Sequence, residues 1–429
     1  MPDWRTVQLH EVADIRVSNV DKKAVAGELP VKLCNYMDVY GNDYIRADLP
    51  FMEATSTAAE IERFGVRRGD VMITKDSETP DDIGIPSVVL DDIEGLVCGY
   101  HLAQLRPREA VVDPTYLSKQ LSLPETSAYF AQRATGSTRY GLSTRTIAQT
   151  PIRLAPLIEQ QRIAAILTSL DTAIEATEAL IEKHQQIKVG LMHDLFTRGV
   201  TNNGCLRAPS SEAPHVYRTV GDQCIPVDWQ VERLDDLATR GSGHTPNKNV
   251  PEYWNGGIKW ISLADSHRLD ALYISETELN ISHRGIQNSS AVLHPSGIVV
   301  LSRDAGVGKS AITTEPMAVS QHFMCWRCDH RLDNHFLYYW LQYKKRMFEN
   351  IAMGSTILTI GLPYFKKLRI ACPVSLDEQR AIAGRLKSAD EHLFAMRDQL
   401  EKLRAKKQGL MQDLLTGKVR VPVPAGASA

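Results

Sequence analysis

The sequence has few cysteines, no long apolar run and no excess of charge of either sign. Seven cysteines are scattered over 429 residues, an odd number without the dense spacing of a disulfide framework, which suits a reducing compartment better than secretion. No run of about 18 apolar residues occurs, and residues 1–5 have neither the basic start nor the apolar stretch of a signal peptide. We therefore expect a cytoplasmic protein with no membrane partner.

Positive and negative residues are nearly equal in number, so the net charge alone does not indicate which kind of partner the protein binds. Lys plus Arg number 49 and Asp plus Glu number 51, so total charge does not indicate a nucleic-acid-binding protein, and any basic surface must be local. Hydrophobic residues make up 43% and charged residues 23% of the chain, which excludes wholesale disorder. The length is about three times that of a usual single domain, so we expect two or more domains.

Signatures of catalysis are also missing. We find no Asn/Asp-Pro-Pro-Tyr/Phe motif of adenine methyltransferases and no helicase or nuclease signature. The segment 303–310 ends like a phosphate-binding loop, but Arg303 stands where the motif needs its first glycine. Cys325 and Cys328 form a lone CxxC without a second pair at zinc spacing, and strand alternation would point them to opposite faces. We expect a non-catalytic chain without its own cofactor or metal; an enzyme that uses Lys309 or the cysteine pair is the less favoured alternative.

An internal repeat is the most informative feature of the sequence. Both copies fit the pattern EQxxIAxxL, at 159–167 and 378–386, a separation of 219 residues. The same separation joins 190–197 to 409–416, with six identities in eight positions. Weaker matches upstream stay in order and place His101 opposite His322. For these two histidines a shared structural role, such as a satisfied hydrogen bond, is favoured over catalysis.

Apolar residues in the repeated segments alternate in spacing between four and three. This a/d pattern, sustained over more than about four heptads without a proline, predicts two long helices. Two copies in one chain favour mutual packing over a dimerisation coil or an ordinary core helix. Lys188 and Lys407 share the seam, and we expect their ammonium groups to reach water. Ser375 and Glu378 have the spacing of a capping box. The seam consists of Ile163, Leu167, Leu170, Ile174, Ile181, Leu191, Leu195, Ile382, Leu386, Leu393, Met396, Leu400, Leu403, Leu410 and Leu414.

The segments before the predicted helices have a mixed α/β pattern. Short β-branched runs at 71–74 and 298–301 end in polar turns. Cations gather in corresponding stretches of the two copies, with Tyr140 or Tyr364 among them, which is typical of phosphate contact; a solvated charged face is the alternative. These cations are Arg133, Arg139, Arg145 and Arg153, and Lys344, Lys345, Arg346, Lys366, Lys367 and Arg369.

This architecture resembles the specificity subunit of Type I restriction-modification enzymes over residues 1 to about 420. The most specific marks are PLIEQxxI at 156–163, its copy with one extra residue at 373–378, and the GLMxDL(F/L)T helix ends. The GHTP at 243–246 with EYWNGGIKW at 252–260 looks like the opening of a common recognition-domain type, whereas 31–40 resembles another variant. Different domains imply different half-sites.

The resemblance implies the division of labour in a complex. Each domain would read one half of a bipartite double-stranded DNA target, and the two helices would pack antiparallel and hold the domains apart. Methylation subunits would dock on this scaffold, bind S-adenosylmethionine and methylate adenine, while a restriction or motor subunit translocates and cuts DNA. A protein-only coiled-coil adaptor is the alternative function.

The expected fold is α+β, with two mixed α/β target recognition domains separated by two long helices packed as an antiparallel coiled coil. The segment 201–218 is rich in Asn, Gly, Ser and Pro and predicts a linker. The expected parts are 1–155 as the first recognition domain, 156–200 as the first helical spacer, 201–218 as the linker, 219–374 as the second recognition domain, 375–420 as the second helical spacer and 421–429 as a disordered tail.

Candidate DNA contacts are donors in predicted loops near the corresponding landmarks of the two copies. Cations would contact phosphates and position the chain, and polar side chains would read base edges. The candidates are Asn35, Tyr36, Lys75, Arg139, Tyr140 and Arg145 in the first domain, and Thr245, Lys248, Asn249, Arg303, Lys309, Gln321 and Lys366 in the second.

Overall fold

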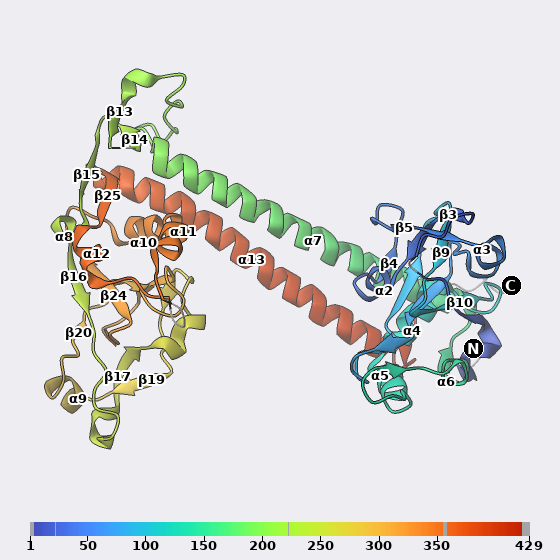
Figure 1. Cartoon of the computed structure of the whole chain (residues 1–429). Coiled ribbons are helices and arrows are strands. Elements are labelled where there is room, and N and C mark those ends of the chain that lie inside the picture. The colour runs from blue at the N-terminus through green and yellow to red at the C-terminus, as the bar shows by residue number, and fades with distance from the viewer. Residues whose placement is uncertain (1–3, 22, 222, 355–357, 423–429) are drawn as a thin grey trace. The chain divides into compact units, whose positions relative to one another are not determined.

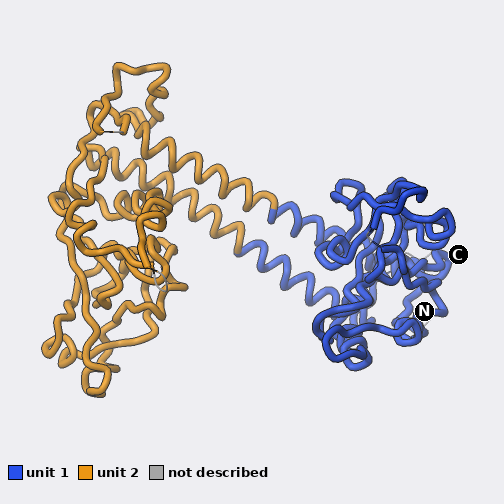
Figure 2. Tube along the Cα trace, viewed as in Figure 1, with its two compact units in different colours: residues 1–178, 398–429 blue, residues 179–397 orange. Residues whose placement is uncertain are grey.

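The computed structural model describes residues 4–21, 23–221, 223–354 and 358–422 and divides the chain into two compact units (Figure 2). Unit 1 comprises residues 1–178 and 398–429, and unit 2 comprises residues 179–397. The boundary falls within both long helices, α7 (Leu157–Arg198) and α13 (Leu376–Leu415). Each unit is therefore one α/β domain together with half of each long helix, which is the α+β class expected from the repeat.

Unit 1 is built on a five-stranded sheet of order β2-β10-β6-β8-β4 (Figure 1). Neighbouring strands are antiparallel except β4 and β8, which are parallel. A three-stranded sheet, β5-β3-β9, carries a second apolar cluster. The strands are β1 (Arg5–Gln8), β2 (Ala13–Val17), β3 (Leu29–Cys34), β4 (Tyr44–Ile45), β5 (Met52–Ser56), β6 (Val71–Thr74), β7 (Asp76–Ser77), β8 (Pro86–Val89), β9 (Leu96–Cys98), β10 (Leu102–Pro107), β11 (Tyr140–Gly141) and β12 (Pro151–Leu154).

Unit 2 has a main sheet of the same order, β16-β24-β21-β22-β18, again with only its last pair parallel. Its second sheet, β19-β17-β23-β20, has one strand more than that of unit 1. The sequence suggested two different domain variants. The structure shows that their main sheets share one strand order and that their second sheets differ. The strands are β13 (Tyr217–Val220), β14 (Gln223–Pro226), β15 (Trp229–Arg233), β16 (Ala238–Ser242), β17 (Trp254–Ile261), β18 (Tyr273–Ile274), β19 (Leu279–Ile281), β20 (Leu293–His294), β21 (Val299–Ser302), β22 (Ser310–Thr313), β23 (Met317–Val319), β24 (Phe323–Cys328) and β25 (Arg369–Pro373).

Short helices close the sheets in both units. Helices α4 and α10 pack on the main sheets, and each begins at an aspartate cap, Asp113 or Asp333, whose carboxylate accepts backbone N–H groups of the first turn. The helices of the α/β parts are α1 (Leu9–Val12), α2 (Tyr36–Tyr40), α3 (Ala58–Phe64), α4 (Pro114–Leu121), α5 (Pro124–Ala131), α6 (Thr144–Ala148), α8 (Leu234–Leu237), α9 (His283–Gln287), α10 (Asn334–Tyr343), α11 (Lys345–Ile351) and α12 (Leu362–Lys367), with 3₁₀ turns at Pro214–Val216, Pro251–Tyr253 and Leu263–His267.

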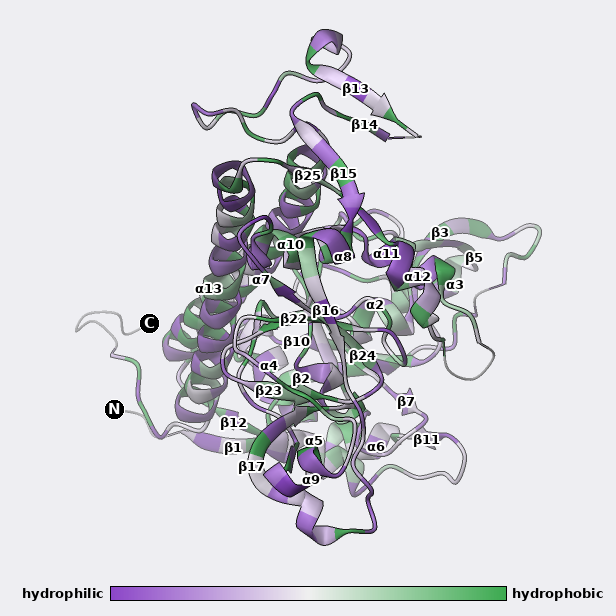
Figure 3. Ribbon diagram, turned by 90° about the vertical axis from the view of Figure 1, so that its left-hand side faces the viewer, coloured by the Kyte–Doolittle hydropathy of each residue, from purple (hydrophilic) through white to green (hydrophobic). Residues whose placement is uncertain are grey.

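The halves of α7 and α13 run antiparallel within each unit. In unit 1 Asp171 pairs with Lys407 and Glu178 with Arg404, so the position on α13 falls as the position on α7 rises. Hydrophilic and hydrophobic residues alternate along both helices (Figure 3). The predicted seam positions are all buried or half-buried: Ile163, Leu167, Leu170, Ile181, Leu195, Ile382, Leu386, Leu393, Leu400 and Leu414 are buried, and Ile174, Leu191, Met396, Leu403 and Leu410 are half-buried.

The two seam lysines are half-buried, and both form ion pairs that the sequence did not predict. Lys188 pairs with Asp390, which also accepts a hydrogen bond from the Tyr339 hydroxyl at 3.0 Å. The Lys407 Nζ lies 2.6 Å from Asp171 Oδ1. Each lysine faces an aspartate on the other helix, so a charge-assisted hydrogen bond across the half-buried seam adds to the packing expected from the sequence.

The repeated glutamine of the EQ pattern fastens each helix to its own domain. Gln160 and Gln379 are fully buried. The Gln160 Oε1 accepts from the Asp113 backbone N–H at 2.9 Å, and its Nε2 donates to two backbone carbonyls. Gln379 makes the same three contacts in unit 2, with Asp333 as the N–H donor at 2.9 Å. Each buried side chain thus satisfies three backbone groups that are buried or half-buried.

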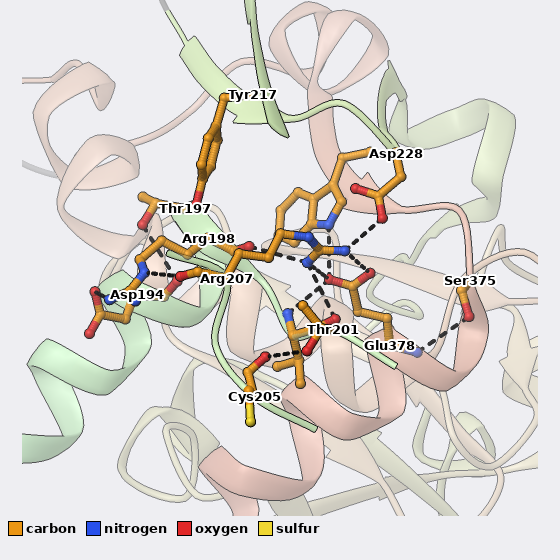
Figure 4. Close-up of polar contacts among 12 residues, drawn as sticks. Asp194, Thr197, Arg198, Thr201, Cys205, Arg207, Tyr217, Asp228, Ser375 and Glu378 are labelled. Atoms are coloured by element: carbon orange, nitrogen blue, oxygen red, sulfur yellow. Dashed lines mark hydrogen bonds and ion pairs between the residues drawn. The ribbon is translucent and has the colours of Figure 1, made fainter. Parts of the chain in front are cut away.

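The glutamate before each of these glutamines, Glu378 or Glu159, accepts hydrogen bonds from a tryptophan and an arginine of its own unit. Glu378 accepts hydrogen bonds from the Trp229 indole at 3.1 Å and from both terminal nitrogens of Arg207, which also reaches Asp228 (Figure 4). Ser375 Oγ accepts from the Glu378 N–H at 3.4 Å, which is one half of the predicted capping box; the Glu378 carboxylate accepts from Arg207 and Trp229. The segment expected to be a plain linker therefore supplies Arg207, a buried cation that joins it to α13.

Unit 1 repeats this arrangement with residues from both ends of the chain. Glu159 accepts from the Trp4 indole at 3.1 Å and from Arg420 at 2.7 and 2.8 Å. The Val421 N–H also donates to Glu159, so ordered contacts extend into the segment expected to be disordered. Residues 423–429 of that predicted tail lie outside the described residues.

Candidate DNA interface

In each main sheet, the central strand is followed by a cationic residue and then by an aspartate. Lys75 and Asp76 follow β6, and Arg303 and Asp304 follow β21. The backbone N–H of Lys75 donates to His101 O at 2.9 Å, and that of Arg303 to His322 O at 3.0 Å. The two units therefore place the same three-residue framework of cation, aspartate and histidine at the corresponding end of the main sheet.

The two equivalent histidines lie within hydrogen-bonding distance of the two aspartates. His101 Nδ1 is 2.8 Å from Asp76 Oδ2, and His322 Nδ1 is 2.8 Å from Asp304 Oδ2. In unit 2 the Thr359 hydroxyl also donates to Asp304. Both histidines therefore have the same hydrogen-bonded position in their units, in agreement with the shared structural role expected from the sequence. The aspartates were not among the predicted residues, although Asp76 and Asp304 lie just after the β-branched runs 71–74 and 298–301.

In unit 1 the framework borders an open cavity of about 480 Å³ lined by Tyr36, Arg139, Asp76 and His101, among others. Tyr36 stacks on Tyr40 of the same short helix, with ring centroids 5.5 Å apart. Burial raises the pKa of the Tyr36 hydroxyl, so it is a neutral donor at physiological pH.

Two further predicted residues lie beside this cavity in unit 1. The Lys75 ammonium sits 5.6 Å from the Tyr100 ring centroid and 3.3 Å from Asp76. Tyr140 pairs with Ser77 across β11 and β7. The structure thus brings Tyr36, Lys75, Arg139 and Tyr140 together. Tyr40 and Tyr100, both exposed, are aromatic neighbours that no sequence pattern identified.

In unit 2 three predicted residues meet around the framework. The Thr245 hydroxyl donates to Gln321 Oε1 at 2.6 Å, and Gln321 Nε2 lies 3.3 Å from His322 Nε2. The Arg303 Nε is 3.6 Å from Asp304. Thr245, Gln321 and Arg303 come from three separate segments of the chain, so only the folded domain places them together. We call Thr245, Gln321, His322 and Asp304 the unit 2 polar cluster.

Other predicted residues lie elsewhere or are engaged within the fold. Lys309 donates to Ser266 O at 2.9 Å, so its ammonium serves the structure of unit 2. Lys248 and Asn249 are exposed on the β16–β17 loop. Arg145 on α6 and Lys366 on α12 are also exposed, with no described contact to either framework. Asn35 precedes α2 and is half-buried, and its N–H donates to Asp38 at 2.7 Å.

The segments that resembled cofactor motifs have other structures. Residues 303–309 connect two antiparallel strands, β21 and β22, in a hairpin, whereas a phosphate-binding loop leads from a strand into a helix. Cys325 is buried with its Sγ 3.5 Å from His294 Nε2, and burial raises its pKa to about 12. Across the described ranges, no three His, Cys, Asp or Glu side chains are grouped so as to hold a metal ion.

Comparison with known proteins agrees with this architecture. The family model described as Type I restriction modification DNA specificity domain matches residues 1–186 and 226–404. Two proteins of Methanocaldococcus jannaschii are similar: a putative type I restriction enzyme MjaX specificity subunit, 23% identical over 98% of this chain and 94% of the relative, and the type I restriction enzyme MjaVIII specificity subunit, 25% identical over 98% and 93%.

Solved structures share the fold. A Type I restriction-modification S subunit from M. genitalium aligns with a TM-score of 0.58 and 13% identity over 96% of each chain. A chain solved in a study of complex assembly and conformational transition of the type I R-M system aligns with a TM-score of 0.57 and 18% identity over 98% of this chain and 99% of that one.

The fold and the paired polar frameworks define a protein with two DNA specificity domains attached to a pair of long helices. The chain belongs to the family of Type I restriction-modification specificity subunits. Among the described residues, no helix combines the length and apolarity needed to cross a lipid bilayer.

Proposed function

We propose that this chain reads a bipartite double-stranded DNA target, with one half-site read by each unit. The observation that carries the proposal is that one sheet framework occurs twice and presents different side chains at the same edge: tyrosines and Arg139 in unit 1, and Thr245 with Gln321 in unit 2. Cations such as Lys75 and Arg303 would position the backbone, and the differing side chains would read bases. The catalytic steps would belong to partner subunits in the cytoplasm.

The partner subunits would dock on the helical halves. In unit 2 a groove of about 950 Å³ is lined by residues of α7, α13 and the β18 region. Val189 and Phe394 on its helical side are 70% and 75% exposed, and exposed apolar side chains that line one groove are typical of protein interfaces. We propose that the methylation subunits, which would bind S-adenosylmethionine and methylate adenine, use this surface, and that the restriction or motor subunit joins the same complex.

A domain exchange tests the proposal. Residues 219–374 are replaced by the matching segment of another family member, and methylated adenines are mapped in DNA from cells that carry the complete system. We expect one half of the methylated motif to change and the other half to stay. A change in both halves, or in neither, would contradict independent reading by two units. If no duplex DNA binds even with methylation subunits present, the protein-only adaptor is the better description.

Docking is tested separately. Phe394→Asp should weaken co-purification of the methylation subunits by at least about tenfold in affinity, because a charge then enters an apolar interface. Gln399→Asp adds the same charge at an exposed position of α13 outside the groove and should assemble normally. Equal assembly of both variants would remove the groove from the docking surface.

A further inference from the structure

Beside the shared framework lies one position at which the two units differ. The residue directly before the framework histidine is Tyr100 in unit 1 and Gln321 in unit 2, and both side chains are exposed. The histidine, the aspartate and the backbone hydrogen bond to the cation are the same in both units. A fixed support with a variable exposed residue is what two domains need if they read different bases with one topology.

The Gln321 amide is held at both ends. If the His322 Nδ1–H donates to Asp304, its Nε2 is the acceptor and faces the Gln321 Nε2 at 3.3 Å. The Thr245 hydroxyl donates to the amide oxygen at 2.6 Å. These two contacts fix which end of the amide is oxygen and which is nitrogen. One lone pair on Oε1 and one N–H on Nε2 remain for a ligand.

That remaining pair of groups matches one base edge in the major groove. A glutamine side chain can donate to adenine N7 through its amide nitrogen and accept from the adenine N6 amino group through its oxygen. We propose that Gln321 is a specificity-determining residue of unit 2 that reads adenine, with Thr245 and His322 as positioning residues. This inference rests on the proposed DNA-reading function and adds the side chain and the base class.

Unit 1 supplies the contrast. Tyr100 occupies the position of Gln321, and its ring lies edge-on to His101 with centroids 4.5 Å apart. A tyrosine presents one hydroxyl and an aromatic edge, which cannot make the two-bond contact of a carboxamide. The half-site of unit 1 therefore should not show the glutamine-type adenine preference at the corresponding position.

The experiment measures base preference in the assembled methyltransferase. The complex is reconstituted with its methylation subunits and bound to a library of duplexes randomised in both half-sites. Gln321→Glu replaces the amide donor with an acceptor, which suits the cytosine amino group. We expect the preference for adenine at one position of the unit 2 half-site to fall by roughly 10- to 100-fold and cytosine to gain, while the unit 1 half-site stays unchanged. Gln321→Ala should lose the discrimination without gaining a new base.

Matched variants separate reading from folding and positioning. Gln287→Glu makes the same charge change on exposed α9, outside the unit 2 polar cluster, and should leave the preferred sequence intact. Thr245→Val should weaken the preference at the same base, and Thr245→Ser, which keeps the hydroxyl, should restore it. A purely structural role for Thr245 would instead lower binding to every sequence equally.

The outcomes distinguish this inference from the function on which it rests. If the wild-type complex shows no sequence preference in the library, the proposed function itself fails. If the wild-type complex selects a bipartite sequence and neither Gln321→Glu nor Gln321→Ala alters the unit 2 half-site, DNA reading stands and the role of Gln321 is overturned. A change confined to the unit 1 half-site would also overturn it.

Discussion

The two units treat the same helical ion pair differently. In unit 2 the pair of Lys188 and Asp390 is half-buried, with side chains 23% and 29% exposed. In unit 1 the equivalent Asp171 is only 5% exposed and holds two lysines, Lys407 at 2.6 Å and Lys119 at 2.8 Å. The repeat thus supplies one ion pair per unit, and the domain of unit 1 has added a second cation. The two units therefore differ at this ion pair because a residue of the α/β domain, Lys119, contacts the long helix in unit 1.

The largest difference should follow from removing the central aspartate. Asp171→Ala leaves Lys119, which is 2% exposed, with a single carboxylate partner, and should destabilise unit 1 by about 3–5 kcal/mol. Asp390→Ala should cost unit 2 about 1 kcal/mol because solvent screens its lysine. Amide hydrogen exchange of the β1–β12 and β15–β25 pairs measures the two units separately. Equal losses would contradict the difference in burial.

The buried glutamines should show the opposite result, an equal effect in both units. Gln160→Ala and Gln379→Ala each leave one backbone N–H and two carbonyls unsatisfied. Each should destabilise its own unit by about 2–3 kcal/mol, measured by the same exchange method. The exposed neighbour Gln161→Ala is the control and should change stability by less than about 0.5 kcal/mol. A loss in only one unit would show that the repeated contacts are not equivalent.

Sequence reasoning succeeded where a periodic pattern carries the structure. The spacing of residues such as Leu167 and Leu386 predicted both helices and their buried faces, because an apolar stripe on a helix must be covered. The partners of Lys188 and Lys407 depend on the register between two antiparallel helices, which no local pattern encodes. The contact between Thr245 and Gln321 joins residues 76 positions apart in the chain, so only the folded domain shows it.

The arginine contacts should differ moderately between the units. Arg207 is 10% exposed and bonds both oxygens of Glu378, whereas Arg420 is 36% exposed in its contact with Glu159. Arg207→Ala should therefore cost unit 2 about 2 kcal/mol, and Arg420→Ala should cost unit 1 about 1 kcal/mol. Urea unfolding followed by the fluorescence of Trp229 or Trp4, which contact the two glutamates, checks the order. A reversed order would contradict the role of burial here.

The smallest expected difference is a pH dependence confined to unit 1. Burial alone would raise the pKa of Asp43, but the ammonium groups of Lys119 and Lys407 lower it from 3.8 to about 2. A carboxylate whose pKa is lower in the folded state stabilises that state fully above its unfolded pKa, and this contribution is lost as the pH falls from about 4 to about 2.

The Asp43 side chain is 54% exposed, so solvent screening should limit the effect to about 1 kcal/mol or less. Asp43→Asn cannot ionise and should remove the corresponding part of the acid-induced loss. We expect unit 1 of the wild-type chain to lose more stability than the Asn variant between about pH 4 and about pH 2, the window set by the unfolded and folded pKa values of Asp43. Hydrogen exchange of β1 and β12 reports this loss, and unit 2 serves as the reference within the same molecule because Asp43 lies in unit 1. If the variant and the wild type lose equal stability in unit 1, the two lysines do not stabilise the Asp43 carboxylate, and Asp171 alone holds them.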